Sequence, residues 1–295
     1  MLYRRLVHLG LLAVLAPRAV AFAQQRVLFE KQSPYNTVVV TEDERGLRTL
    51  LFERGGVRQS VVKPGEPDHI ELAYARVMPA GLALVKAPER ILIVGLGGGT
   101  IPSFLHKHYP RTRIDVVDID PVVVEAAKKF FDFREDATLR AYVDDGRRFI
   151  ENCRQPYDVI FLDAFGSESI PYHLATREFL RAVRAAVSPK GVVLANVWSS
   201  NSNPLYESMV RTYRDVFERL YIVDVFGAGN RILVALPRKE EIRVDDFVRK
   251  ARAVSRERNF PFDMGDAVSQ GFRKPENDEV GGEVLRDKKP AKKAG

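Results

Sequence analysis

The stretch Ile91–Thr100, ILIVGLGGGT, decides the fold, because four apolar residues run directly into a glycine-rich bend. A strand, a glycine bend and a helix in this order open many nucleotide-binding units. Gly95, Gly97 and Gly99 allow the backbone to approach a ligand closely, which a Cβ atom would prevent. The helix predicted over Thr100–His108 points its first N–H groups at the same place. Taken alone, the pattern also fits a tight packing turn.

The chain around this bend alternates strands and helices. Strand patterns follow one another at residues 90–95, 113–120, 138–145, 157–165 and 191–198. Alternating strands and helices predict an α/β domain with a mostly parallel sheet covered on both faces. The last two strand patterns, at 220–226 and 231–236, have no helix between them and predict an antiparallel hairpin.

The segments on either side of this core differ from it in composition. Short β-type runs between residues 27 and 62 predict a small antiparallel module, and apolar spacing over 69–84 predicts a helix. We therefore expect a β-hairpin domain at 24–66 and a catalytic domain at 67–262. Residues 263–295 are polar and basic, which predicts a disordered tail.

The first 23 residues have the form of a secretory signal peptide. Arg4 and Arg5 precede an apolar run over Leu9–Ala16, and Ala21 and Ala23 flank the expected cleavage point. The apolar run is too short to span a bilayer as a stable helix. We expect export to the periplasm with no integral membrane span after cleavage. If the segment is not a functional signal, the protein is cytoplasmic.

Charge and cysteine content exclude several classes of partner. The net charge is +7, but the final ten residues, RDKKPAKKAG, carry five bases and one acid without interleaved aromatic residues. This favours a solvated tail over a nucleic-acid-binding arm. One cysteine, Cys153, cannot form an intrachain disulfide, and the five histidines lack metal-ligand spacing. We expect neither a nucleic-acid partner nor a metal.

Acidic residues end the strands that follow the glycine bend. Asp118 lies about 20 residues beyond the glycines, where a carboxylate can accept hydrogen bonds from both ribose hydroxyls. Asp144 and Asp145 end the next strand, and an acid at that edge can accept from an adenine amino group. Asp163 ends the buried strand YDVIFLDAF and is the best catalytic candidate, whereas Asp120 before a proline predicts a helix cap and Asp158 a structural role. Together these acids favour an adenosine-type ligand.

The order and spacing of these motifs resemble the spermidine and spermine synthases, the polyamine aminopropyltransferases, from about residue 33 to 226. The resemblance is carried by SPYNTVVVTED, GGVRQS, ILIVGLGGGT, VVDIDPVVVEAAKKFF, DDGRRFI, YDVIFLDAF and TREFLRAVRAAVSPKGVVLAN. It implies a methyltransferase-like, Rossmann-type sheet behind a small N-terminal β-domain. It also implies transfer of an aminopropyl group from decarboxylated S-adenosylmethionine to an amine, no metal, and a homodimer.

The same resemblance assigns roles to individual residues. Asn36 and Gln59 are expected on the cofactor side of the cleft, with Asp118 on the ribose and Asp145 on the adenine. Asp163 is expected to be the acid-base residue. An amine has a pKa near ~10, so a carboxylate has to take up its proton before the nitrogen can attack.

The chain differs from the family at positions where the family contacts the aminopropyl amine of the donor and the acceptor amine. Gly98 stands where the family has an aspartate that faces the aminopropyl amine, and Gly166 stands at a second acid, for which Glu168 is a candidate substitute. Of the family's Tyr-His-Glu or Tyr-Gln-Glu triplet, HIE keeps Glu71. These differences place specificity for putrescine in doubt.

The segment DAFGSESIPYHLATREFL resembles a divergent bacterial branch of spermidine synthase-like proteins. In that branch residues 169–176 form a lid, and Tyr172 and His173 face the acceptor. The alternative is that both are helix-cap and surface residues.

Three functions remain open from the sequence. The first is an aminopropyltransferase acting on a non-standard amine. The second is an S-adenosylmethionine-dependent methyltransferase, which Gly98 favours because a donor carboxylate would no longer meet a negative charge. The third is a catalytically silent protein that binds an adenosyl ligand, which export favours because adenosyl donors are made in the cytosol.

Overall fold

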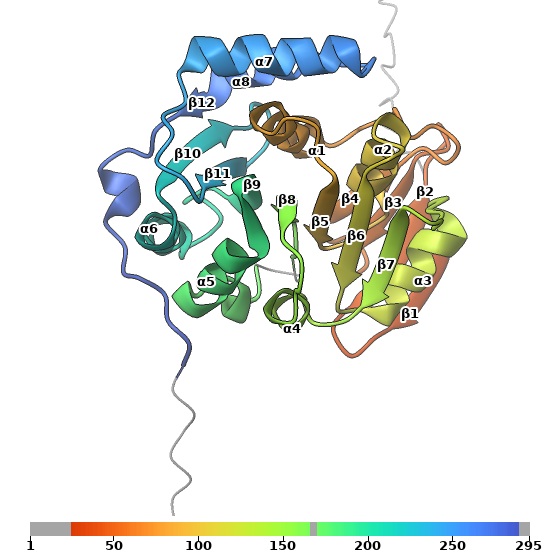
Figure 1. The fold of residues 1–295 in the computed structure, drawn as a ribbon. Coiled ribbons are helices and arrows are strands. Elements are labelled where there is room, and N and C mark those ends of the chain that lie inside the picture. The colour runs from red at the N-terminus through yellow and green to blue at the C-terminus, as the bar shows by residue number, and fades with distance from the viewer. Residues whose placement is uncertain (1–24, 166–169, 289–295) are drawn as a thin grey trace, which may run out of the picture.

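The computed structural model describes residues 25–165 and 170–288, which form two sheets joined by helices (Figure 1). The smaller sheet is antiparallel, in the order β1-β2-β3-β4. Its strands are β1 (Arg26–Gln32), β2 (Thr37–Glu42), β3 (Arg48–Leu51) and β4 (Arg58–Val62). This is the hairpin module that the short β-type runs predicted.

The larger sheet has eight strands in the order β12-β10-β11-β9-β8-β5-β6-β7. They are β5 (Arg90–Val94), β6 (Arg113–Asp118), β7 (Leu139–Val143), β8 (Tyr157–Leu162), β9 (Val187–Trp198), β10 (Arg219–Asp224), β11 (Asn230–Leu236) and β12 (Phe272–Arg273). Strands β5 to β9 pair in parallel, and β10 and β11 form the predicted antiparallel hairpin.

The order of the parallel strands positions the site. From β5 the chain proceeds to β6 and β7 on one side, then returns to β8 and β9 on the other. The crevice beyond the carboxyl ends of β5 and β8 therefore lies at a topological switch point, where open α/β sheets bind their ligands. Gly95 follows β5 and Asp163 follows β8, so the fold brings these two positions together.

Helices cover both faces of this sheet. They are α1 (Ala73–Val77), the 3-10 helix η1 (Met78–Leu84), α2 (Thr100–His108), α3 (Pro121–Phe130), α4 (Gly146–Glu151), the 3-10 helix η2 (Tyr172–Leu174), α5 (Arg177–Ala186), α6 (Tyr206–Val216), α7 (Val244–Glu257), α8 (Met264–Gly271) and the 3-10 helix η3 (Asp278–Val280). Along β5, Ile91 and Ile93 pack on the face covered by α2, and Leu92 and Val94 on the face covered by α4, α5 and α6. This alternation is the period of a strand.

Helix α3 joins the two sheets. Val124 and Ala127 pack into the core of the large sheet, while Val122, Val123 and Ala126 pack against Val38, Val40 and Leu50 of the small sheet. Because α3 has an apolar surface on two sides, the small sheet is held next to the glycine bend rather than at a distance.

The prediction of a disordered tail from residue 263 is wrong for 263–288. Helix α8 packs on α7 with Met264 and Val268 fully buried. Further along, Glu279 accepts hydrogen bonds from Arg273 (2.6 Å) and Arg231 (2.7 Å). A few apolar side chains and a cluster of ion pairs hold this segment to the rest of the protein. It has no regular spacing of apolar residues, so its sequence resembles that of a disordered tail.

The signal-peptide prediction lies outside the described residues and stays a prediction. Within the described parts of the chain, no helix combines the length and apolar character that a membrane crossing requires.

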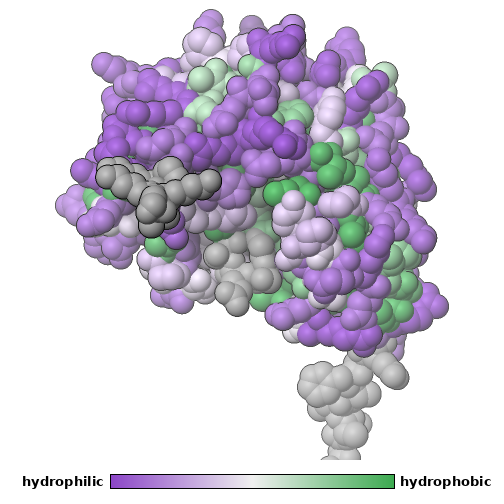
Figure 2. Space-filling view, turned by 90° about the horizontal axis from the view of Figure 1, so that it is seen from below, coloured by the Kyte–Doolittle hydropathy of each residue, from purple (hydrophilic) through white to green (hydrophobic). Residues whose placement is uncertain are grey.

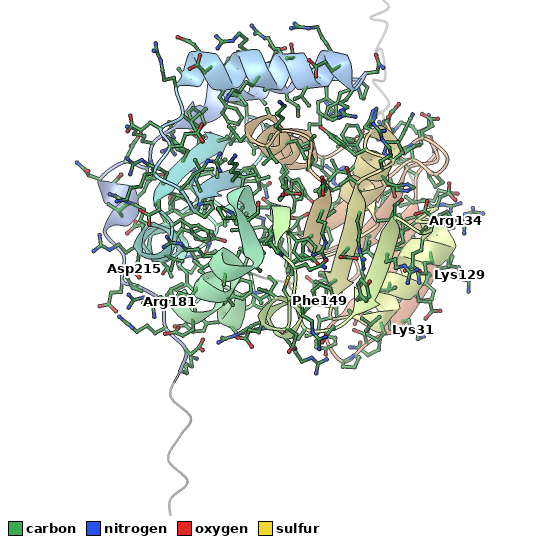
Figure 3. The ribbon with its side chains drawn as sticks, in the orientation of Figure 1. Lys31, Lys129, Arg134, Phe149, Arg181 and Asp215 are labelled. Carbon is green, nitrogen blue, oxygen red and sulfur yellow. The ribbon has the colours of Figure 1, made fainter. Side chains whose placement is uncertain are left out.

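Charged side chains such as Lys31, Lys129 and Arg134 lie on one flank of the molecule, and Arg181 and Asp215 on the other (Figure 3).

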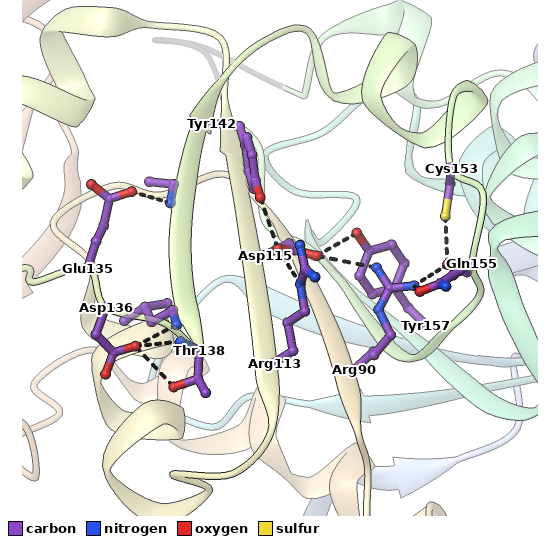
Figure 4. Close-up of polar contacts among 12 residues, drawn as sticks. Arg90, Arg113, Asp115, Glu135, Asp136, Thr138, Tyr142, Cys153, Gln155 and Tyr157 are labelled. Atoms are coloured by element: carbon purple, nitrogen blue, oxygen red, sulfur yellow. Dashed lines mark hydrogen bonds and ion pairs between the residues drawn. The ribbon is translucent and has the colours of Figure 1, made fainter.

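One charged cluster lies inside the large sheet. Asp115 on β6 is 2% exposed and contacts Arg90 (3.4 Å) and Arg113 (3.3 Å). It also accepts hydrogen bonds from the phenols of Tyr157 (2.9 Å) and Tyr142 (3.4 Å), as Figure 4 shows. Four donors around one carboxylate make this a structural cluster.

Candidate active site

An open cavity, of about 900 Å³ when the solvent at its mouth is included, lies between the carboxyl ends of β5 to β8 and the small sheet. Viewed from below, this face has hydrophobic residues gathered near its centre within a largely hydrophilic surface (Figure 2). Eight residues predicted from the sequence line the cavity: Asn36, Gln59, Gly95, Gly97, Asp118, Asp145, Asp163 and His173. The fold therefore brings most of the predicted site residues to one cavity.

The three glycines of the bend have different surroundings. Gly95 has φ +102° and lies so close to β8 that a Cβ atom would be 2.3 Å from the Asp163 carbonyl oxygen. Gly97 has φ +54° and lies against Ser60. Gly99 also has positive φ, but it packs on Phe133 and does not line the cavity, so its role is to begin α2 rather than to contact a ligand.

Asp118 is half-buried beneath the glycine bend. One carboxylate oxygen accepts from the Leu96 N–H and the other from the Asp120 N–H, each at 2.9 Å. Burial raises the pKa of Asp118 to about 6, although these backbone donors lower it. The Gly97 N–H is a third backbone donor to this carboxylate, which leaves about one lone pair for a further donor. Asp120 caps α3 through the Val122 N–H, as predicted.

Asp145 serves two local contacts at the next strand end. It caps α4 by accepting from the Arg148 N–H, and its other oxygen lies 2.8 Å from Nε2 of His173. Burial opposes ionisation, but the Arg148 N–H and His173 together lower the pKa of Asp145. His173 therefore lies at the Asp145 end of the cavity, rather than where an acceptor amine would meet Asp163.

Asp163 is half-buried and has neutral partners. Asn196 on β9 donates its amide to Oδ1 at 2.9 Å, and the phenol of Tyr74 on α1 lies next to the same carboxyl. Burial raises the pKa of Asp163 to about 7, although both hydrogen bonds lower it. Asn230 on β11 donates to the Asn196 side-chain oxygen at 2.9 Å, which fixes the Asn196 amide with its NH₂ toward Asp163.

A second open cavity, of about 480 Å³ when the solvent at its mouth is included, adjoins the first and shares Gln59, Tyr74 and Phe165 with it. The rings of Phe165 and Trp198 stack along its wall, with centroids 5.7 Å apart. Asn196 also lines it, so this cavity reaches the side chain that holds Asp163.

Two predicted substrate residues, Glu71 and Tyr172, lie elsewhere. Glu71 contacts His69 (3.1 Å) and Arg45 (3.5 Å) and does not line either cavity. Tyr172 turns away and donates to the Arg286 carbonyl at 3.1 Å. Glu168 falls outside the described residues.

Sequence reasoning missed Tyr74 and Asn196. Tyr74 sits in an apolar helical pattern that predicted core packing, and Asn196 sits in the buried run 191–197 of β9. A polar residue inside a buried strand near its carboxyl end was the available signal for Asn196. Asp158 has the predicted structural role, since it accepts from the Glu89 and Arg90 N–H groups.

Gly98 is closed off from the cavity. A Cβ atom there would lie 3.0 Å from both Phe131 and Ser60 and 3.1 Å from Val62. The packing around the bend therefore leaves little room for the aspartate that the family carries at this position.

The fold and the switch-point cavity define a methyltransferase-like α/β enzyme. The model of the spermine/spermidine synthase domain matches residues 72–224. Polyamine aminopropyltransferase from Vibrio vulnificus is 38% identical over 223 residues, which cover 73% of this chain and 74% of that protein. The chain therefore belongs to the spermine/spermidine synthase family, whose aminopropyltransferases are transferases.

Methyltransferases are also similar to this chain. The bovine eEF1A lysine and N-terminal methyltransferase is 32% identical over 200 residues, which cover 61% of this chain but only 28% of that protein. Human methyltransferase-like protein 13, solved in complex with SAH, has a TM-score of 0.59 and 28% identity over 65% of this chain and 95% of that chain.

Solved spermidine synthases have a similar fold. A probable spermidine synthase from Corynebacterium glutamicum has a TM-score of 0.68 at 20% identity, covering 89% of this chain and 97% of that one. At this identity the likeness shows the fold alone. Among the described residues, no three His, Cys, Asp or Glu side chains gather as a metal site.

Proposed function

We propose that this chain transfers an aminopropyl group from decarboxylated S-adenosylmethionine to a small amine, with Asp163 as the proton acceptor. One observation carries the proposal. A carboxyl whose pKa is raised to about 7 faces the switch-point cavity, with an amide and a phenol as partners rather than a cation. A carboxylate in this setting can accept a proton near neutral pH.

The transfer balances with these groups. The acceptor nitrogen attacks the aminopropyl carbon bonded to the sulfonium, the C–S bond breaks, and its electron pair leaves with neutral methylthioadenosine. The proton released from the nitrogen goes to Asp163. Because the leaving thioether is neutral, no acid is needed on that side. Holding donor and acceptor in line supplies much of the acceleration.

The donor is held from the other side of the cavity. Asp118 lies in the cavity wall beneath the glycine bend, where its carboxylate can accept from a ribose hydroxyl in addition to its backbone donors. Asn36 and Gln59 close the cavity from the small sheet, and Asp145 lies at its far end for the adenine.

Methyl transfer from intact S-adenosylmethionine is the second candidate. The glycine at position 98 favours it. The packing there leaves little room for an acidic side chain, which would repel the carboxylate of the intact donor. The relatives named as methyltransferases point the same way. In methyl transfer, too, Asp163 would accept the proton that the attacking amine releases.

Calorimetry on the full chain separates the two. The titrants are decarboxylated S-adenosylmethionine, S-adenosylmethionine and methylthioadenosine, with Asp118→Asn as a control of nearly equal shape. Tighter binding of the decarboxylated donor supports aminopropyl transfer, and tighter binding of the intact donor selects methyl transfer. Absence of binding by all three contradicts both and leaves a silent family scaffold.

Export and dimer formation are further proposals. The tripartite pattern of residues 1–23 supports export, and the family resemblance supports a homodimer. Cell fractionation with N-terminal sequencing tests the first, where a mature chain beginning at Gln24 is expected. Sedimentation of the purified protein tests the second. An intact Met1 in the cytoplasmic fraction, or a monomer, would contradict them.

A further inference from the structure

The second cavity lies where an acceptor would approach Asp163. It shares Tyr74 and Phe165 with the donor cavity, and Asn196 lines it while donating to Asp163. A molecule held there therefore lies on the Tyr74 and Asn196 side of the carboxyl, next to the donor cavity. Its contacts decide which amine reaches the reacting carbon.

The wall of this cavity is aromatic. Phe165 and Trp198, the one tryptophan of the chain, stack at an interplanar angle of 29°. Aromatic faces bind flat or apolar bodies well, and they also tolerate a single ammonium. The antiparallel pairing of Trp198 with Asn230 places the amide of Asn230 at the same end.

The charge on the wall is positive. Arg58 on β4 lines the cavity, and among the described residues that line it no other side chain is charged. The negative charge, on Asp163, lies at the inner end, in the neighbouring cavity. One ammonium near Asp163 is thus matched, whereas a second ammonium toward Arg58 meets a like charge, which raises its free energy of binding.

From this arrangement we propose that the second cavity is an acceptor subsite for a primary amine with one positive charge and an apolar or aromatic body, and that Arg58 disfavours diamines. The inference rests on the proposed function, because it takes the occupant of this cavity to be the amine that attacks the donor.

A matched pair of amines tests it. Putrescine and n-butylamine have the same four-carbon chain and differ by the second amino group, and phenethylamine adds a ring. Release of methylthioadenosine by the full chain should have a kcat/KM for n-butylamine about tenfold above that for putrescine, which corresponds to one favourable charge difference near a protein surface. Phenethylamine should exceed n-butylamine.

Arg58→Glu should reverse the order of putrescine and n-butylamine, and Arg58→Gln, which removes the charge without adding one, should bring the two close together. Trp198→Leu should lower the advantage of phenethylamine without changing the ratio of the other two. Arg58 is exposed, so its variants are expected to fold. Preference of the wild-type protein for putrescine, with a ratio that Arg58→Glu leaves unchanged, would overturn the proposal.

A binding measurement keeps this result separate from the proposed function. The same amines are titrated into protein saturated with methylthioadenosine, which requires no turnover. If no amine reacts but n-butylamine binds more tightly than putrescine in an Arg58-dependent way, aminopropyl transfer fails while the selectivity of the subsite stands. If no amine binds, the subsite proposal fails.

Discussion

Asp115 lies on β6 and Asp163 directly follows β8 of the same sheet, with β5 between the two strands, yet their surroundings differ in charge. Asp115 is 2% exposed and has two guanidinium groups and two phenols around it (Figure 4). Asp163 has one amide and one phenol as described partners, and neither is charged. The ion pairs of Asp115 tie β5 and β6 together, whereas a carboxyl with neutral partners beside a cavity can exchange a proton with a ligand.

The comparison predicts that Asp163 matters for activity and Asp115 for stability. The largest effect should come from Asp163→Asn, which keeps the shape but removes the proton acceptor. The expected loss in kcat is about 10²- to 10⁴-fold, measured as methylthioadenosine release. A loss of less than about threefold would mean that another group takes the proton, and binding of methylthioadenosine should stay unchanged as a control.

The same variant should be more stable at pH 8 and equally stable at pH 4. The folded pKa of Asp163, about 7, lies above the unfolded value of about 3.9, so ionisation costs stability as pH rises from about 4 to 7. Removing the charge recovers on the order of 1–3 kcal/mol above pH 7. Thermal unfolding at the two pH values measures it, and equal gains at both would point to packing instead of charge.

Asp115→Ala should show the opposite pattern. It leaves the partly buried Arg90 and the half-exposed Arg113 without their shared anion, and the free energy of unfolding should fall by about 2 kcal/mol. Urea unfolding measures the loss. The kcat of the folded protein should stay close to the wild-type value, because the cluster does not line the cavity. A large fall in kcat with normal stability would contradict this division.

A smaller effect is expected from Asn196→Ala. The Asn196 amide lowers the pKa of Asp163, so its loss should move the rising limb of the kcat/KM profile to higher pH, by about one unit or less. Asn230→Ala, which frees the Asn196 amide without touching Asp163, is the matched control and should move the limb less. An unchanged limb in both variants would remove Asn196 from the positioning of Asp163.

The smallest effect concerns Asp118. Burial raises the pKa of Asp118 to about 6, so its affinity for a ribose should weaken as pH falls below 6, where the carboxylate gains a proton and loses an acceptor site. The Kd of methylthioadenosine should rise severalfold between pH 7 and pH 5. Asp118→Asn should bind weakly and show a flat profile over the same range.

The sequence predicted the elements that periodicity and turn chemistry define. The helix Thr100–His108, the parallel strands and the cap at Asp120 follow from local patterns, and the family resemblance placed Asn36 and Gln59 across the cleft. The tail at 263–288 failed because long-range ion pairs hold it, and no local period reports them.

The donor side of the site was more predictable than the acceptor side. Asp118 and Asp145 lie at strand ends in a fixed spacing, whereas Tyr74 of α1 and Trp198 of β9 come to line one cavity only through tertiary packing. Glu71 and Tyr172 were chosen by motif position. Arg45 and His69 hold the side chain of Glu71 away from the cavity, and the Arg286 carbonyl, distant in the sequence, holds that of Tyr172.

The most direct test of the account is the titration of Asp163 itself. Carbon-13 NMR of protein labelled at the aspartate carboxyl groups, recorded from pH 3 to 9, measures it, and the resonance missing in Asp163→Asn assigns it. The account predicts a midpoint near 7 for that resonance. A midpoint below about 4.5, the ordinary range of an exposed aspartate, would contradict the claim that neutral partners keep this carboxyl ready to accept a proton.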